Sequence, residues 1–304
     1  MNHSSNSKKS TTPWYKGSLG NLVIDFLALT KAEIVVLLLI TTFSAMVLAS
    51  GGLPDPVLAI AVCLSGALAA GGAGAINQYA DREVDALMAR TRRRPLTVGR
   101  IAPNTALGLG IVFNIAAFII LVFLVNTLSA LLVLAGSLFY IIVYTLWLKK
   151  VTPENIVIGG AAGAIAPLVG WTSVTASVDW PAVYMFGIVF LWTPPHFWAL
   201  ALLLKQDYTK ANIPMLPVVA GVAKTNQRIL LYSIILAAFT MCFPFIVSLS
   251  WIYISVSSLL NIFLLYACLK LFRGPVPPAA RHLFQYSLVY LSCLFVTLAI
   301  EGAI

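Results

Sequence analysis

Long apolar runs separated by short polar breaks dominate the chain. Stretches without Asp, Glu, Lys or Arg cover residues 34–54, 56–80, 101–148, 155–178, 180–204, 229–269 and 282–300. A helix that crosses a bilayer needs about 20 consecutive apolar residues. Five stretches fit one span each, and two fit a pair, with polar breaks near Asn126–Ser129 and near Ser248–Ser250. The pattern predicts an all-α polytopic membrane protein with nine transmembrane helices.

The basic residues predict how these helices are oriented. If the N-terminus is cytoplasmic, all 19 Lys and Arg residues fall in cytoplasmic segments, while Asp55, Asp179 and Glu301 fall on the other face. Lys and Arg are enriched in the cytoplasmic loops of membrane proteins. An odd number of spans then places the C-terminus outside the cytoplasm.

Composition supports a membrane location. Only 10% of the residues are charged and 60% are hydrophobic, whereas a soluble protein carries about 25% charged residues. The net charge of +9 follows from the membrane topology and gives no reason to expect nucleic-acid binding. The four cysteines lie inside predicted spans without CxxC spacing, so they indicate neither a disulfide framework nor a zinc site.

The N-terminal region differs from the rest of the chain. Residues 1–20 are rich in Ser, Thr and Lys and contain no hydrophobic core of a signal peptide. We therefore expect a flexible cytoplasmic tail over 1–20, followed by a single transmembrane domain over 21–304. A bacterial inner membrane is the simplest location for such a chain.

Two cytoplasmic loops, 77–103 and 205–228, are longer than the others and are not of low complexity. Long loops in compact proteins are usually functional or disordered. The two loops lie four helices apart and each begins near acidic residues, which suggests an internal repeat of helix–loop–helix units. We expect these two loops to carry the function.

The first loop begins with a regular set of oxygen ligands. Asn77, Asp81 and Asp85 recur every four residues, so they share one face of a helix that continues the second span. Two carboxylates and an amide oxygen suit Mg²⁺, which binds few protein ligands together with substrate phosphates. The alternative is a solvated surface in which the acids pair with neighbouring arginines. Glu83 points away from the shared face and is a weaker candidate.

A cluster of arginines follows these acids. Three consecutive arginines, Arg92 to Arg94, exceed what membrane topology requires. Arginine binds phosphate through two parallel hydrogen bonds. A metal-binding acidic face beside a basic cluster at the membrane edge predicts a site for a diphosphate with a lipid tail.

The segment NQYADREVDALMARTRRRPLTVG, residues 77–99, resembles the NxxxDxxxD signature of the UbiA-type intramembrane prenyltransferases. Segments 144–171, 192–202 and 207–219 narrow the resemblance to the branch that farnesylates protohaem IX. The resemblance runs from about residue 25 onward. It implies the nine-helix UbiA-type bundle, in agreement with the number of spans counted above.

The resemblance also implies a reaction and its ligands. Farnesyl diphosphate would donate its farnesyl group to a vinyl group of haem B, with addition of water, giving haem O and diphosphate. Asn77, Asp81 and Asp85 would hold Mg²⁺ and act in catalysis, with a second ion near Asp207. The cationic partners expected for the diphosphate are Arg94, Lys149, Lys150 and Lys205, for which membrane topology is the alternative explanation. Where the family commonly reads LTKPR, this chain reads LTKAE, which leaves Lys31 as the basic residue there.

His196 lies in the sixth span, directly after two prolines. Ionisable groups inside a bilayer are usually functional, and the resemblance makes a contact with haem the functional interpretation. Prolines also free backbone carbonyls that need partners. A haem contact and a hydrogen bond to such a carbonyl therefore both remain open for His196.

Two other functions compete with haem farnesylation. A prenyltransferase for an aromatic quinone precursor would share the diphosphate site. A secondary transporter would also show repeats and broken helices, but it would place ionisable groups near the midplane. Besides its two substrates and the lipid bilayer, the expected partners are a haem O monooxygenase or a terminal oxidase.

Overall fold

The computed structural model describes residues 15, 16 and 19–304. Most of the tail predicted over 1–20 therefore lies outside the described residues. Tyr15, which falls within that range, is buried and pairs with Ile101 in an isolated antiparallel bridge. The packed part of the chain thus includes a residue before the predicted boundary at residue 21.

The described residues contain nine helices long and apolar enough to cross a membrane, as predicted. Seven are single helices: α2 (Ala32–Ser50), α3 (Pro56–Leu87), α4 (Pro103–Leu124), α7 (Asn155–Thr175), α8 (Trp180–Leu203), α12 (Trp251–Arg273) and α13 (Val276–Ala303). One combines α5 (Thr127–Leu138), the π-helical η2 (Phe139–Leu148) and α6 (Lys149–Val151), and one combines α11 (Gly221–Cys242) with η3 (Phe243–Phe245). Four shorter helices complete the fold: η1 (Leu19–Asn21), α1 (Leu22–Thr30), α9 (Lys205–Lys210) and α10 (Leu216–Val219).

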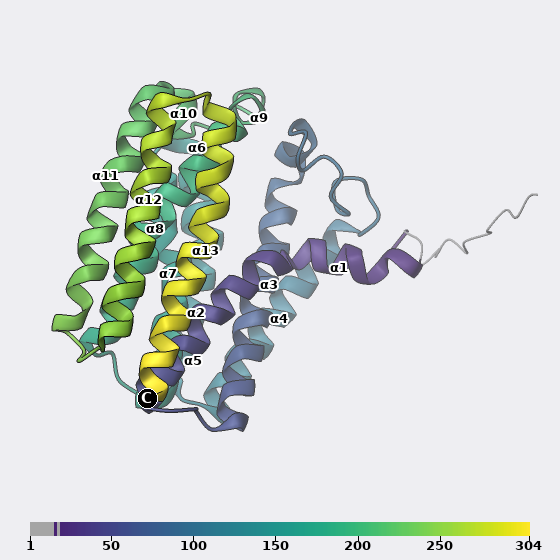
Figure 1. Ribbon diagram of the computed structural model, residues 1–304. Helices are drawn as coiled ribbons and strands as arrows, with labels where there is room; N and C mark the ends of the chain where they lie inside the picture. The colour runs from purple at the N-terminus through teal and green to yellow at the C-terminus, as the bar shows by residue number, and fades with distance from the viewer. Residues whose placement is uncertain (1–14, 17–18) are drawn as a thin grey trace, which may run out of the picture.

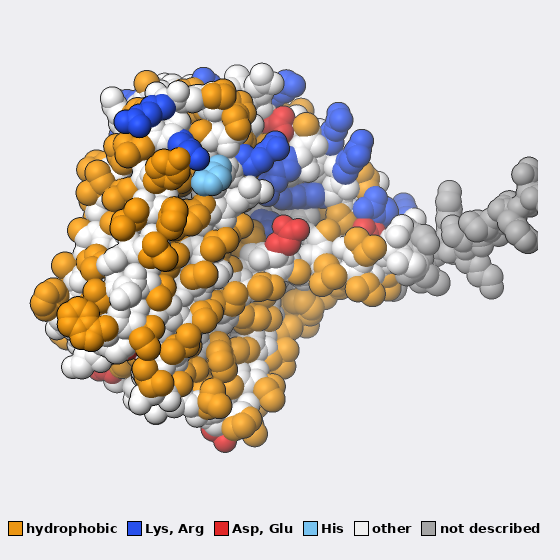
Figure 2. Space-filling view, viewed as in Figure 1, with side chains coloured by type: hydrophobic (Ala, Val, Ile, Leu, Met, Phe, Trp, Pro, Cys, Tyr) orange, Lys and Arg blue, Asp and Glu red, His pale blue; other side chains and the backbone are white. Residues whose placement is uncertain are grey.

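The helices form one bundle with two differently charged ends. α11, α12 and α13 pack together on one side, α3 packs on α4 on the other, and α1 projects from the α3 side (Figure 1). Lys and Arg side chains gather at the upper end of the viewed face, which we call the basic end, whereas acidic side chains also occur at the lower end (Figure 2). The C-terminus lies at the end opposite the basic end (Figure 1).

Both predicted breaks within the long apolar stretches are confirmed. Asn126 separates α4 from α5, and its side-chain oxygen accepts a hydrogen bond from the Ser129 backbone N–H, which is otherwise unsatisfied at a helix start. Ser250 caps α12 in the same way through the Ile252 N–H. Short polar side chains at these positions end one span and begin the next.

The length of α3 places its acidic residues outside the hydrocarbon core. Its 32 residues measure about 48 Å at 1.5 Å per residue, more than the ~30 Å hydrocarbon core. Asp55 caps its start, with Pro56 at the first helical position. The helix therefore continues beyond the membrane and carries Asn77, Asp81 and Asp85 on its last turns, as predicted.

The second predicted loop is shorter than expected. α9 and α10 lie within residues 205–228, and α11 begins at Gly221 rather than at 229. A stretch without charged residues marks the part of a helix that lies in the membrane. The helix itself can begin earlier, because backbone hydrogen bonds also form at charged positions. Arg228 lies in α11 and forms an ion pair with Glu154, the N-cap residue of α7. The first turns of α11 are therefore charged and still helical.

Small residues let the helices approach closely. A Cβ atom on Gly170 of α7 would lie 2.1 Å from the Thr42 carbonyl oxygen of α2. A Cβ on Gly72 of α3 would lie 2.7 Å from the Gly110 carbonyl oxygen of α4. Close packing at small residues is a main source of helix association in membranes.

Candidate active site

The last turns of α3 present a buried polar face. Asn77, Asp81 and Asp85 are 3%, 2% and 4% exposed. Asp81 Oδ2 accepts hydrogen bonds from Asn77 Nδ2 (2.9 Å) and from Lys149 Nζ (2.5 Å). Asp85 Oδ2 accepts from Arg94 Nη1 at 2.7 Å. The three residues share one face, as their spacing predicted, and each acid is paired with a cation from another segment.

Lys31 also belongs to this site. It stands between α1 and α2 in the left-handed conformation (φ 53°), which is uncommon for residues other than glycine. Its Nζ donates to Asn77 Oδ1 (2.5 Å) and to the Tyr140 hydroxyl (3.0 Å). Burial, together with the nearby Arg94 guanidinium, lowers the pKa of Lys31 to about 8. The sequence contained a signal for it, since Lys31 is the basic residue retained in LTKAE.

The π-helical η2 brings further side chains to α3. Thr145 donates to the Tyr140 carbonyl oxygen five residues earlier (2.9 Å) and accepts from Asn77 Nδ2 (3.0 Å). This wider winding precedes Lys149, whose amine reaches Asp81. π-Helical turns are rare and occur frequently at functional sites. No pattern in the sequence predicted this segment.

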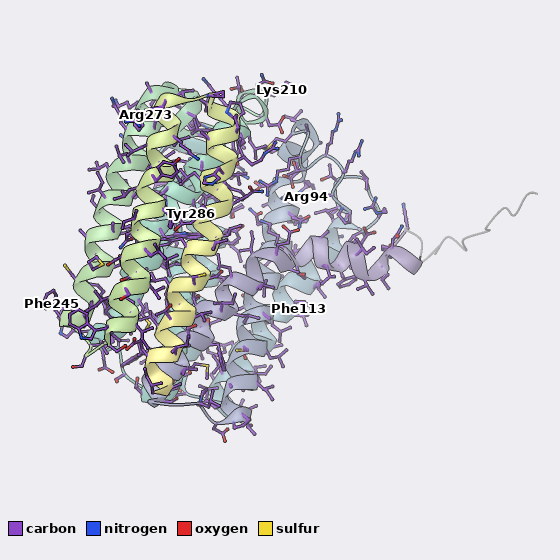
Figure 3. The ribbon with its side chains drawn as sticks, in the orientation of Figure 1. Arg94, Phe113, Lys210, Phe245, Arg273 and Tyr286 are labelled. Atoms are coloured by element: carbon purple, nitrogen blue, oxygen red, sulfur yellow. The ribbon has the colours of Figure 1, made fainter. Side chains whose placement is uncertain are left out.

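The two long predicted loops meet at the site. Asp207 of α9 accepts a long hydrogen bond, 3.4 Å, from the Arg90 backbone N–H in the first loop. Arg94 lies beside the last turns of α3 at the basic end, and Lys210 of α9 lies at the same end, whereas Phe245 lies at the opposite end (Figure 3). Residues 117 positions apart in sequence thus form one polar region.

Three charged residues singled out from the sequence are not joined to the acids. Lys150 is exposed and Lys205 is partly exposed, and within the described part of the chain neither side chain forms a hydrogen bond or an ion pair with the acids. Glu83 has a side chain that is 87% exposed, and among the described residues it forms an ion pair with Arg82 alone. Its outward direction agrees with the helical spacing.

The chemistry of the buried face fits Mg²⁺. Asp81 Oδ1 is fully buried and has no hydrogen-bond partner, which leaves a carboxylate oxygen available to a cation. Among the described residues, no group of three or more His, Cys, Asp or Glu side chains is placed to hold a metal ion. Mg²⁺ typically binds one or two carboxylates and completes its shell with water and phosphate oxygens. The site therefore suits a metal ion that arrives with a diphosphate.

A second buried ion pair anchors the first loop. Asp25 of α1 accepts from Arg100 Nε and Nη2, both at 2.8 Å, and from the Tyr15 hydroxyl at 3.0 Å. The hydrogen bond to Asp25 raises the pKa of Arg100, so this guanidinium stays charged. Residues 88–102, which include Arg94, are thereby tied to α1 at their far end. The signal missed in the sequence was a single acid in the apolar segment LVIDFLALT.

His196 is buried in α8, and its neighbours come from α8 itself and from α13. Its Nδ1 lies 2.7 Å from Ser287 Oγ. The Trp192 and Phe284 rings stack on the imidazole at centroid distances of 4.3 Å and 4.6 Å. α8 continues through the two prolines, and His196 bonds a side chain of another helix, not a carbonyl that the prolines free. Among the described residues His196 thus forms no hydrogen bond to such a carbonyl, and its contact with haem stays a prediction.

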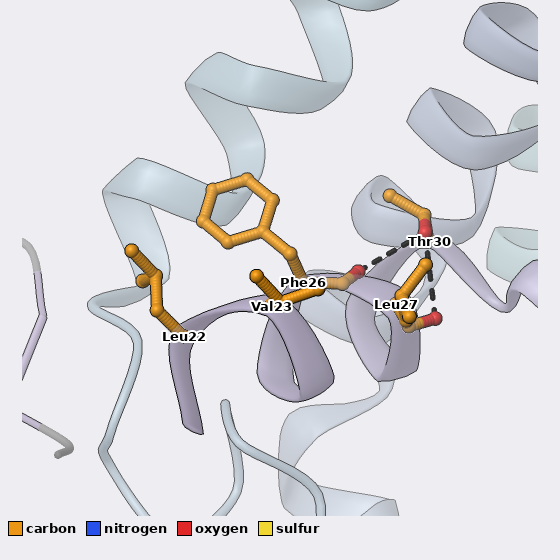
Figure 4. Close-up of a pocket in the computed structure, with 5 residues that line it drawn as sticks. All are labelled: Leu22, Val23, Phe26, Leu27 and Thr30. Carbon is orange, nitrogen blue, oxygen red and sulfur yellow. Dashed lines mark hydrogen bonds between the residues drawn. The ribbon is translucent and has the colours of Figure 1, made fainter. Parts of the chain in front are cut away.

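The surface has a basic recess and a separate apolar hollow. Basic side chains gather in a recess between the α13 side and α1 (Figure 2). A hollow along α1 is lined by Leu22, Val23, Phe26, Leu27 and Thr30 (Figure 4). The Thr30 hydroxyl donates to backbone carbonyls of α1, so this hollow presents apolar groups and offers no diphosphate site.

Comparison with known proteins agrees with this architecture. The model of the UbiA prenyltransferase family matches residues 38–294. A protein named Protoheme IX farnesyltransferase from Symbiobacterium thermophilum is 48% identical over 284 residues, covering 93% of this chain and 95% of that protein. A protein of the same name from Gloeobacter violaceus is 45% identical over 279 residues, covering 91% and 92%.

Solved structures show the same fold. A UbiA homolog from Archaeoglobus fulgidus bound to DMAPP and Mg²⁺ superposes with a TM-score of 0.72 at 20% identity, covering 92% of this chain and 99% of that one. A digeranylgeranylglyceryl phosphate synthase superposes with a TM-score of 0.75 at 17% identity, covering 92% and 98%. At these identities the match concerns the fold alone.

Proposed function

The chain belongs to the UbiA prenyltransferase family, and we propose that it transfers the farnesyl group of farnesyl diphosphate to a vinyl group of haem B. The C1–O bond of the farnesyl donor breaks, and its electron pair leaves with diphosphate. The vinyl π electrons form the new C–C bond. Water adds to the resulting cation and releases a proton, which gives haem O.

The observation that carries this proposal is the pair of buried carboxylates at the end of α3, each held by a cation from another segment. Ionisation of an allylic diphosphate leaves a concentrated negative charge. Lys31, Lys149 and Arg94 converge on the buried face, where they would bind the diphosphate oxygens and stabilise the leaving group. Electrostatic groups fixed before reaction are usually the largest contribution to catalysis.

Mg²⁺ fits the same proposal. Asn77, Asp81 and Asp85 would hold one ion, and Asp207 from the second loop would contribute to another. When bound, Mg²⁺ neutralises the diphosphate and so favours its departure. Arg94 and Lys149, which pair with Asp85 and Asp81 in the structure, would then bind phosphate oxygens in place of the acids. Lys150 and Lys205 stay proposed as outer contacts for the diphosphate.

The acceptor is proposed from the relatives, which carry the name Protoheme IX farnesyltransferase at 45–48% identity over nearly the whole chain. His196, stacked between aromatic rings, is the proposed haem contact. We place the protein in a bacterial inner membrane with its basic end in the cytoplasm, in accordance with the positive-inside rule. A haem O monooxygenase or terminal oxidase is the proposed receiver of the product.

The test uses the purified full-length protein in lipid nanodiscs with Mg²⁺, farnesyl diphosphate and haem B. Mass spectrometry should detect a haem whose mass has increased by one farnesyl group and one hydroxyl group. A parallel reaction replaces haem B with 4-hydroxybenzoate. Product from 4-hydroxybenzoate and none from haem B would refute the proposed acceptor and favour an aromatic substrate.

A further inference from the structure

The hydrogen bonds around His196 determine its tautomer. Ser287 Oγ lies 2.7 Å from the Phe284 carbonyl oxygen and 2.7 Å from His196 Nδ1. A carbonyl oxygen only accepts, so the single hydroxyl proton of Ser287 points to Phe284. The hydroxyl oxygen must then accept the second bond. His196 therefore carries its proton on Nδ1 and donates it to Ser287.

The other ring nitrogen is left as an available acceptor. Within the described part of the chain, no acidic side chain bonds the His196 ring, and the apolar surroundings favour its neutral form. Nε2 consequently holds a lone pair. No hydrogen bond from the described residues reaches Nε2, and it is not among their fully enclosed polar atoms that lack a partner. Nε2 therefore keeps a small exposed area and has no partner among the described residues.

Packing fixes the direction of that lone pair. The imidazole is sandwiched between Trp192, with an interplanar angle of 17°, and Phe284, at 24°. Phe197 meets the ring edge-on at 85°. Trp192 Nε1 also donates to the Ser287 carbonyl oxygen at 2.8 Å. Ser287 is completely buried, and it bonds two aromatic residues of α8 from α13.

We propose that Ser287 is a positioning residue, which holds His196 in the Nδ1–H tautomer so that Nε2 binds the iron of the porphyrin acceptor. The inference rests on the proposed function, because that function supplies a haem. Imidazole Nε2 is a common metal ligand. Metal-binding histidines almost always donate their other N–H to a fixed partner, and loss of that partner typically costs 10–100-fold in metal affinity. Ser287 provides such a partner.

The experiment measures haem B bound to the full-length protein in nanodiscs without farnesyl diphosphate. Absorbance titration gives the dissociation constant, and resonance Raman spectroscopy of ferrous haem reports the iron–histidine stretching band. Ser287→Ala should weaken binding by about 10-fold and lower the frequency of this band, because Nδ1–H loses its acceptor. Ser287→Thr should retain wild-type behaviour, and His196→Ala should abolish the band.

A matched control lies on the same helix. Thr297 of α13 is buried and donates to the Cys293 carbonyl oxygen, so Thr297→Val removes a comparable hydroxyl and should change neither reading. If Ser287→Ala does not fold, Ser287→Cys replaces it, because a thiol is a weak acceptor and the band must shift in the same direction.

The inference is overturned if the Ser287 variant leaves both readings unchanged, or if the band persists in His196→Ala. Either result would leave Ser287 as a packing contact between α8 and α13. Failure of the proposed function looks different. In that case wild-type protein would bind haem through His196 and form no farnesylated product. Normal product formation with unaltered Ser287→Ala spectra would refute the inference alone.

Discussion

Replacing Asp81 with asparagine tests the proposed diphosphate site most directly. Asp81→Asn preserves the size of the side chain and one carbonyl oxygen, so Lys149 keeps an acceptor. It removes the negative charge and converts one oxygen into an N–H donor. Both oxygens matter, because Oδ2 binds Lys149 and Asn77, whereas Oδ1 is buried without a partner. Oδ1 is therefore the oxygen best suited to a cation.

The expected magnitude follows from these contacts. An unsatisfied amide N–H in place of Oδ1 costs about 1–3 kcal/mol of folding stability, which leaves the protein folded. Loss of one preorganised electrostatic contact to a developing charge typically reduces kcat by about 10²–10³, or ~2.7–4 kcal/mol. We expect kcat for haem farnesylation to fall at least ~100-fold, with a higher Mg²⁺ concentration needed for half-maximal activity.

The assay is mass detection of farnesylated haem at saturating substrates over a range of Mg²⁺ concentrations. Glu83→Gln is the matched control, since this acid lies two positions away and its side chain is 87% exposed. It should retain wild-type kcat. Activity of Asp81→Asn within about threefold of wild type, far from the ~100-fold loss expected for such a contact, would refute the metal assignment at α3.

Three further outcomes are expected. Lys149→Met leaves Asp81 without its cation, so steady-state kinetics should show a KM for farnesyl diphosphate about 10-fold higher, corresponding to ~1.4 kcal/mol; an unchanged KM would exclude Lys149 from the diphosphate site. Asp25→Asn weakens the double hydrogen bond to Arg100, and thermal unfolding should show about 1–3 kcal/mol lower stability with less loss of activity than Asp81→Asn. Gly170→Ala places a methyl group 2.1 Å from the Thr42 carbonyl oxygen and should destabilise the bundle by about 1–3 kcal/mol; wild-type stability would contradict the close approach of α2 and α7.

The nine spans and the acidic face of α3 could be predicted because their causes are local. Each span must satisfy its backbone within itself and expose apolar side chains to lipid, so its signal is continuous along the chain. Asn77, Asp81 and Asp85 share a face because a helix repeats every 3.6 residues. The start of α11 was misplaced for a related reason. The absence of charged residues indicates that a segment lies in lipid. It does not mark where a helix begins, because backbone hydrogen bonds form at charged positions too.

The partners of these residues required the tertiary structure. Lys31 reaches Asn77 across 46 positions, Lys149 reaches Asp81 across 68, and Arg100 reaches Asp25 across 75. No local pattern encodes such pairs, because they depend on which helix ends meet at the basic end.

Residue types along the chain determined that this protein crosses a membrane, and they predicted an acidic helix face beside a basic cluster at one end. The tertiary structure decided which cations pair with the acids, and it placed Ser287 against His196 across 91 positions. The physical reason is the distance along the chain over which each interaction acts. Periodicity and solvent preference act within one helix, whereas a hydrogen bond between α8 and α13 exists only after both helices have packed.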